Sequence, residues 1–161
     1  MPKSQRCVKV FHYQSNISFV RVTSEQETIE LAREIAPKLK GGDILALSGD
    51  LGAGKTTFTK GLAMALGITK NVTSPTFAIM NVYELPEIKN GIKTLVHIDA
   101  YRLETSDEIL TIGAQDYLSQ PDILTVIEWP EKIQPMLDNY KMIELKFSLE
   151  NSARAISGPL I

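Results

Sequence analysis

The sequence contains one cysteine and two histidines among its 161 residues. A single cysteine, Cys7, excludes an internal disulfide framework and provides no cluster of thiolates for zinc. The two histidines, His12 and His97, do not have the spacing of paired metal ligands. We therefore exclude a disulfide-stapled fold and a thiolate zinc site.

Long apolar runs and an excess of positive charge are also missing. No apolar run approaches the ~20 residues that a membrane-spanning helix requires. The N-terminal stretch MPKSQRCVKVFHYQSN has no continuous apolar core after its basic residues, unlike a secretory signal. The formal net charge of −2 gives the chain no overall basic field with which to bind nucleic acid unaided. We expect a cytoplasmic protein that does not bind a membrane.

The remaining composition, 43% apolar and 22% charged, is that of an ordinary globular protein long enough for one domain. Residues 7–22 alternate only in part, as an exposed hairpin or an extended N-terminal segment would. Ser24 followed by Glu27 then has the spacing of a capping box. A helix is therefore predicted from about Glu25, with Pro37 kinking or ending it.

Further apolar runs alternate with turn residues. A second helix is predicted from about Lys55 to Leu66, with Gly67 as its stop. The predicted strands cover residues 44–47, 77–83, 94–98, 124–128 and 140–149, with Asn90-Gly91 as a tight turn. Strands on both sides of helices indicate an α/β sandwich with a mixed sheet.

The strongest motif is in ILALSGDLGAGKTTFTKGLAMALG, where Gly49, Gly54, Lys55 and Thr56 satisfy G-x-x-x-x-G-K-[ST] between a predicted strand and helix. The glycines let backbone N–H groups turn inward and form an anion site at the helix N-terminus. The Lys55 ammonium, which we expect to be solvated in the protein alone, can reach the β- and γ-phosphates, and the Thr56 hydroxyl can bind Mg²⁺. The motif predicts a nucleoside triphosphate site. The fold class follows as a single P-loop NTPase-like α/β domain over residues 1–161 with a mixed, largely parallel central sheet.

Phosphoryl transfer also needs carboxylates, which usually lie at strand ends beside the loop. Asp99 ends LVHID and Glu128 ends ILTVIE. For either acid alone, a solvent-exposed strand end is an equally good interpretation, but beside a phosphate loop at least one should be functional. Trp129, the only tryptophan, follows Glu128 and is interpreted either as core packing or as a ligand contact.

The segment NVTSPTF lies between the loop and these acids. Pro75 stiffens it, and the hydroxyls of Thr73, Ser74 and Thr76 are candidates to meet Mg²⁺ or the γ-phosphate, as in a switch segment. An ordinary polar turn before a strand explains the composition equally well.

The motifs GDLGAGKTTFTKGL, VTSPTF, HIDAYRL, IGAQDYL and IEWPEKI occur in this order in a chain of this size. The sequence thereby resembles the bacterial TsaE (YjeE) family from about Ser24 to Ile133. That family comprises small P-loop ATPases required for threonylcarbamoyladenosine at position 37 of tRNAs that read codons beginning with A. Residues 1–22 look longer than the family usually carries and form a possible extension.

The resemblance implies an Mg²⁺-dependent ATPase that works with the TsaB and TsaD proteins, while TsaC makes the threonylcarbamoyl-adenylate. It implies contact with tRNA only through that complex. The implied catalytic residues are Lys55, Asp99 and Glu128, and the implied metal ligands are Thr56, Glu128 and Asp99. The implied nucleotide-binding residues are Ser24, Gly49, Asp50, Leu51, Gly52, Ala53, Gly54, Lys55, Thr56, Thr57, Thr76, Trp129 and Arg154. Arg154 is the nearest match to a late arginine of the family, although NSARAISGPLI lacks the family's frequent glycine-arginine pair.

Three other functions fit the sequence less well. A small-molecule P-loop kinase usually needs several arginines on a lid, and the five arginines here are scattered. A GTPase usually carries Asn-Lys-x-Asp, which does not occur, and a direct tRNA-binding module needs a basic patch interleaved with aromatics. An ATPase that drives a protein assembly cycle is favoured, with the kinase as the alternative.

Overall fold

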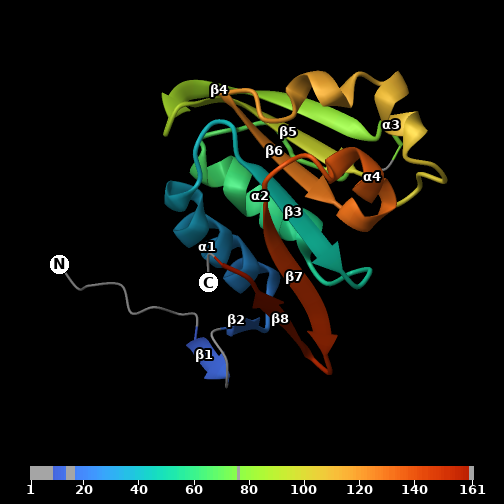
Figure 1. Cartoon of the computed structure of the whole chain (residues 1–161). Coiled ribbons are helices and arrows are strands. Elements are labelled where there is room, and N and C mark those ends of the chain that lie inside the picture. The colour runs from blue at the N-terminus through green and yellow to red at the C-terminus, as the bar shows by residue number, and fades with distance from the viewer. Residues whose placement is uncertain (1–8, 14–16, 76, 160–161) are drawn as a thin grey trace.

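Eight strands form one mixed sheet in the computed structural model of the chain, which describes residues 9–13, 17–75 and 77–159. The strand order is β1-β2-β8-β7-β3-β6-β5-β4 (Figure 1). The strands are β1 (Lys9–Tyr13), β2 (Ile17–Val22), β3 (Ile44–Gly49), β4 (Met80–Lys89), β5 (Ile92–Asp99), β6 (Ile123–Glu128), β7 (Met142–Glu150) and β8 (Ala153–Ser157). The α-helices are α1 (Glu25–Ile35), α2 (Lys55–Ala65), α3 (Asp107–Thr111) and α4 (Gln134–Leu137), and the 3-10 helices are η1 (Ala36–Lys38), η2 (Ala114–Tyr117) and η3 (Pro130–Ile133).

The centre of the sheet is parallel and its edges are antiparallel. β3 pairs in parallel with β6 and β7, and β6 pairs in parallel with β5. The outer strands β1, β2, β4 and β8 have only antiparallel partners. Tight turns such as Asn90-Gly91, where both residues have positive φ, can only join antiparallel neighbours. The predicted α/β class and mixed sheet are confirmed, and the parallel pairing is confined to four adjacent strands, β7, β3, β6 and β5.

Helices cover both faces of the sheet and give it two hydrophobic layers (Figure 1). Leu31 of α1 and Phe58 of α2 belong to the layer that contains Leu45 of β3. Ile44, the preceding residue of β3, belongs to the other layer, together with Ile109 of α3. Successive side chains of a strand point to opposite faces, so the apolar run of β3 serves both layers and must be central.

The start of α1 follows from its cap. The Ser24 hydroxyl accepts a hydrogen bond from the Glu27 N–H at 3.1 Å. The Glu27 carboxylate accepts from the N–H and the hydroxyl of Thr23 at 2.6 and 2.9 Å, so the return contact reaches the residue before the cap. Pro37 lies in η1 directly after α1, as predicted. The helix α2 also has the predicted start and stop, with Gly67 at φ 87°.

Several strand boundaries differ from the predicted ranges, and β4 differs most. A strand was expected over 77–83, but β4 begins at Met80 and continues to Lys89. The Ile79 N–H donates to the Pro75 carbonyl, and Ile79 has φ 65°, a left-handed conformation that β-branched residues rarely adopt. A turn therefore uses the apolar residues that periodicity assigned to the strand.

The N-terminal segment contains the hairpin that was one of its two interpretations. β1 pairs antiparallel with β2, which continues the sheet beyond β8. Cys7 and Thr76 lie outside the described residues. Within the described part of the chain, no helix is both long and apolar enough to cross a membrane.

Candidate nucleotide site

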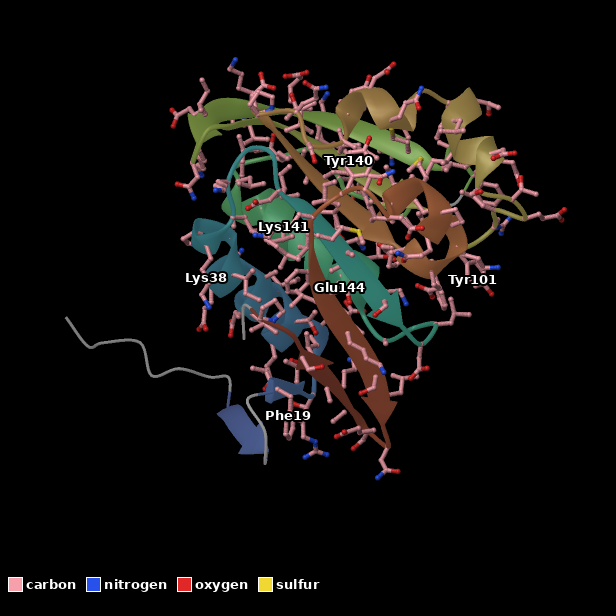
Figure 2. All side chains as sticks on the ribbon, viewed as in Figure 1. Phe19, Lys38, Tyr101, Tyr140, Lys141 and Glu144 are labelled. Atoms are coloured by element: carbon pink, nitrogen blue, oxygen red, sulfur yellow. The ribbon has the colours of Figure 1, made fainter. Side chains whose placement is uncertain are left out.

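The phosphate loop and both predicted acids come together at one edge of the sheet. β3, β5 and β6 end at Gly49, Asp99 and Glu128, and parallel strands end at the same edge. Figure 2 shows Tyr101, two residues after β5, at the end of the molecule to which the β3 arrow points, with Lys38 at the opposite end. A cleft of about 450 Å³ opens here. Its lining residues are Glu25, Leu51, Gly52, Gly54, Lys55, Thr56, Thr57, Ser74, Asp99, Tyr101, Glu128, Trp129 and Arg154.

The P-loop, Gly49 to Thr56, delivers the N-terminus of α2 to this cleft. Gly54 is the N-cap with φ 101°, and no side chain of the described residues caps the helix. Gly49 has φ 121°, and a Cβ there would lie 1.8 Å from the Phe147 carbonyl oxygen, so only glycine fits. The first turn of α2 therefore keeps its N–H groups and the positive end of its dipole for an anion.

Lys55 is buried rather than solvated. Its side chain is 4% exposed, and Nζ donates to the carbonyls of Gly49 and Asp50 at 2.7 and 2.8 Å. Nζ also lies 4.0 Å from the centroid of the Trp129 ring, a cation–π distance. Burial lowers the pKa of Lys55, and nearby carboxylates, Glu128 foremost, oppose that effect. The expectation of a solvated ammonium was wrong, because the loop's own carbonyls and an aromatic face surround it.

Thr56 and Glu128 form a hydroxyl–carboxylate pair at the start of α2. The Thr56 Oγ1 lies 2.9 Å from Oε1 and 3.1 Å from Oε2 of Glu128. Glu128 is 3% exposed. Mg²⁺ prefers oxygen ligands and usually binds through one or two protein groups plus phosphates. The described residues contain no cluster of three His, Cys, Asp or Glu side chains that could hold a metal alone. The Thr56 hydroxyl and the Glu128 carboxylate are two such oxygen ligands, so the pair fits Mg²⁺ whose other ligands would come from a nucleotide and water.

Asp99 is the second acid of the cleft. Its carboxylate accepts hydrogen bonds from the Ser74 hydroxyl and, at 3.1 Å, from the Tyr101 N–H. Asp99 is 6% exposed, so neither acid is a solvent-exposed strand end. The contact with Ser74 brings the NVTSPTF segment to the site through a residue other than Thr76.

Trp129 is half-buried and faces the cleft. Its backbone is left-handed, with φ 60° and ψ 51°. The ring packs against Tyr101 at 5.0 Å between centroids, as well as over the Lys55 ammonium. The residue also packs against the hydrophobic layer that contains Ile44, which agrees with the packing interpretation. Contact with a ligand stays a prediction.

Arg154 reaches the cleft from β8. A Cβ on Gly54 would lie 3.4 Å from the Arg154 Cδ, so the arginine stem passes beside the P-loop. The Arg154 Nε is buried and has no hydrogen-bond partner among the described residues. An unpaired buried donor is costly, and an anionic or polar ligand in the cleft would satisfy it.

Other predicted residues lie outside the cleft lining. Ser24 caps α1, while its neighbour Glu25 lines the cleft instead. The Asp50 carboxylate accepts from the Leu149 N–H at 3.1 Å and supports the P-loop from β7. Ala53 is fully buried.

Sequence reasoning did not name Tyr101 or His97 as site residues, and at the start of α1 it named Ser24 rather than its neighbour Glu25. Glu25 and Tyr101 line the cleft. His97 is fully buried beside Glu128, with 2.8 Å between its Nε2 and the Glu128 Oε1. His97 lies two positions before Asp99 and Tyr101 two positions after it, within the family motif HIDAYRL. Membership of this motif was the only sequence feature that pointed to either residue.

Comparison with known proteins agrees with this geometry. The sequence model of the family described as "Threonylcarbamoyl adenosine biosynthesis protein TsaE" matches residues 22–156. The chain belongs to the TsaE family. The TsaE match includes every residue that lines the cleft and leaves out β1.

Several TsaE relatives are similar over most of the chain. Bacillus subtilis tRNA threonylcarbamoyladenosine biosynthesis protein TsaE is 41% identical over 122 residues, 76% of this chain and 72% of the relative. The Aquifex aeolicus TsaE is 43% identical over 119 residues, with 72% and 79% covered, and the Borreliella burgdorferi TsaE is 36% identical over 133 residues, with 83% and 93% covered. The crystal structure of Bacillus subtilis YdiB superposes with a TM-score of 0.69 at 31% identity and covers 91% of this chain and 87% of that one. The fold is thus that of a P-loop NTPase.

The position of Trp129 predicts a fluorescence signal for nucleotide binding. We expect Mg-ADP or Mg-ATP to change the tryptophan emission. A phosphate that binds Lys55 would change the position or the charge environment of the ammonium that lies over the indole ring. The chain has one tryptophan, so Trp129→Phe provides the blank. A flat titration alongside binding measured by calorimetry would leave Trp129 with a packing role only.

Proposed function

We propose that the chain is an Mg²⁺-dependent ATPase of tRNA threonylcarbamoyladenosine biosynthesis, in which ATP hydrolysis drives a cycle of the TsaB–TsaD complex. The observation that carries the proposal is the group of Lys55, Thr56 and Glu128 at the N-terminus of α2. This group combines a phosphate-directed cation, a metal-binding hydroxyl and a carboxylate at one point. The names of the relatives support the pathway, and a cytoplasmic location would accompany it.

Each residue then has a defined task. The N–H groups of the P-loop and the first turn of α2 bind the phosphate oxygens, and Lys55 adds positive charge where the β- and γ-phosphates meet. Thr56 and Glu128 would hold Mg²⁺, which neutralises charge on those phosphates when it is bound. Asp99, which accepts from Ser74 and the Tyr101 N–H, is the acid we assign to orienting the attacking water.

Few positive charges surround the cleft for the transition state. Arg154 is the only arginine among its lining residues. Arg102 lies over the exposed ring of Phe77, with Cζ 4.4 Å from the centroid. In related NTPases a partner can supply missing groups and exclude water. A low rate in isolation and control by partners are therefore expected.

The chain alone should hydrolyse ATP slowly, and TsaB with TsaD should change that rate. We would measure turnover and TsaB–TsaD binding with ATP, ADP and a non-hydrolysable analogue in turn. A cycle requires the partner affinity to differ between nucleotide states. The chain should bind tRNA only when the complex is present. Equal affinity in every state, with turnover unchanged by the partners, would contradict the cycle and bring back the alternative of a small-molecule kinase.

A further inference from the structure

His97 is a buried titratable residue that none of the tasks above uses. It lies in β5, between β6 and the edge strand β4, and is 0% exposed. The parallel register of β5 and β6 pairs Asp99 with Glu128. His97 lies on the same face of β5 as Asp99, because the two are two positions apart along the strand, with only Ile98 between them. The imidazole thus lies behind Glu128, as seen from the cleft that Glu128 lines.

The hydrogen-bond pattern favours one imidazole tautomer. The His97 Nε2 lies 2.8 Å from the Glu128 Oε1, and a carboxylate that accepts this hydrogen bond places the proton on Nε2. The His97 Nδ1 is buried and has no hydrogen-bond partner within the described ranges. A neutral ring with Nε2–H leaves only a lone pair unpaired there, whereas a proton on Nδ1 would be an unsatisfied buried donor.

This contact limits the orientation of the Glu128 carboxylate. Oε1 accepts from the His97 Nε2–H at 2.8 Å, and both oxygens lie within 3.1 Å of the Thr56 hydroxyl. The last torsion of a glutamate is intrinsically broad, so the carboxylate plane is determined by its donors. Glu128 is 3% exposed, and among the described residues its side-chain donors are Thr56 and His97. Without His97 the carboxylate would lose one of these two.

We propose that His97 is a positioning residue that acts through Glu128, by donating a hydrogen bond from Nε2 that aims the carboxylate at Thr56. The inference rests on the proposed function of the same site, because the orientation of Glu128 matters only where Glu128 serves Mg²⁺ or the reaction. Donors behind a ligating carboxylate orient it, and their loss typically costs about 10–100-fold in metal affinity or activity.

The test compares two variants of His97. His97→Leu removes the donor at similar volume, whereas His97→Gln keeps an N–H at a similar distance from the backbone. Thr125→Val is the control: Thr125 is fully buried on the neighbouring strand β6, and its hydroxyl donates to the Tyr117 carbonyl, away from Glu128. Calorimetry measures nucleotide affinity with and without Mg²⁺, and steady-state kinetics separates kcat from KM.

His97→Leu should lower kcat and the gain in nucleotide affinity that Mg²⁺ provides, each by about 10–100-fold. Its affinity for nucleotide without Mg²⁺ should stay close to that of the wild type. His97→Gln should recover most of both losses, and Thr125→Val should match the wild type. Equal impairment of both His97 variants at unchanged melting temperature would reduce the residue to packing and overturn the proposal.

A spectroscopic measurement on the wild type keeps the proposal testable if His97→Leu does not fold. The chain has two histidines, so the imidazole signals that remain in a long-range ¹H–¹⁵N spectrum of His12→Gln belong to His97. We expect the Nε2–H tautomer for His97, and an Nδ1–H tautomer would overturn the proposal. A wild type without turnover and without a gain from Mg²⁺ would refute the proposed function and this role with it. If the wild type shows turnover and a gain in affinity from Mg²⁺, and His97→Leu shows the same values, only the proposed role of His97 is refuted.

Discussion

Lys55→Ala is expected to abolish measurable ATP turnover while the chain stays folded. Loss of one preorganised electrostatic donor typically costs about 10²–10³ in kcat, and Lys55 contributes a full charge at the point where the P-loop turns into α2. The ammonium already lies at the loop, held by the Gly49 and Asp50 carbonyls. Little reorganisation is therefore needed when phosphate oxygens take over its hydrogen bonds.

The stability of the variant separates this effect from unfolding. Truncation removes the contact with the Trp129 ring and leaves the Gly49 and Asp50 carbonyls without this donor. Gly49 is half-buried and Asp50 is exposed, so water can replace the ammonium. Lys60→Ala is the matched control, since Lys60 is exposed on the same helix and does not line the cleft. Turnover and melting temperature are measured for both. Unchanged hydrolysis by a folded Lys55→Ala protein would falsify the assignment of the site.

The parts of this site that were predictable from sequence depend on local rules. The P-loop motif, the Ser24 cap and the Asn90-Gly91 turn each combine residue types that few backbone conformations suit. Their structures agree with the prediction because the groups that form each of them, such as the Ser24 hydroxyl and the Glu27 N–H, lie within a few residues of one another in the sequence. The burial of Lys55 was not predictable in this way. It depends on the Gly49 carbonyl and on the Trp129 ring, and the position of Trp129 beside the P-loop follows from the pairing of β3 with β6 rather than from the local sequence.

The contacts across the sheet depend on register instead. Thr56 and Glu128 are 72 residues apart, and the motif only indicated that they share an edge. His97 has the sequence context of an ordinary core residue in a buried strand. A slip of one residue between β5 and β6 would turn it to the other hydrophobic layer. Its contact with Glu128 therefore became visible only with the strand pairing.

Backbone conformations with positive φ were the least predictable features. Trp129 and Ile79 are left-handed, yet neither residue type favours that conformation. Both flank the site: Trp129 follows Glu128, and the Asp99 N–H donates to the Ile79 carbonyl. Sequence propensity fails where tertiary contacts impose an unfavourable backbone, and such positions concentrate at functional sites.

Glu128→Gln is expected to lower ATP turnover by about a hundredfold or more, since groups of this kind supply several kcal/mol to the transition state. The substitution keeps the shape of the side chain and an oxygen that can accept from Thr56 or His97. It removes the negative charge that would hold Mg²⁺ against the phosphates. Asp99→Asn should also be impaired.

Glu131→Gln controls for a general loss of negative charge near Lys55. Glu131 raises the pKa of Lys55, as Glu128 does, but it is exposed and does not line the cleft. If the charge of Glu128 acts only by supporting the Lys55 ammonium from a distance, the two variants should be impaired to a similar degree. If it acts on Mg²⁺, Glu128→Gln loses turnover while Glu131→Gln does not, and Glu128→Gln needs a higher Mg²⁺ concentration for its remaining activity. Normal hydrolysis by both Glu128→Gln and Asp99→Asn would mean that neither carboxylate serves the reaction, despite the contacts that bury them beside Thr56 and Ser74.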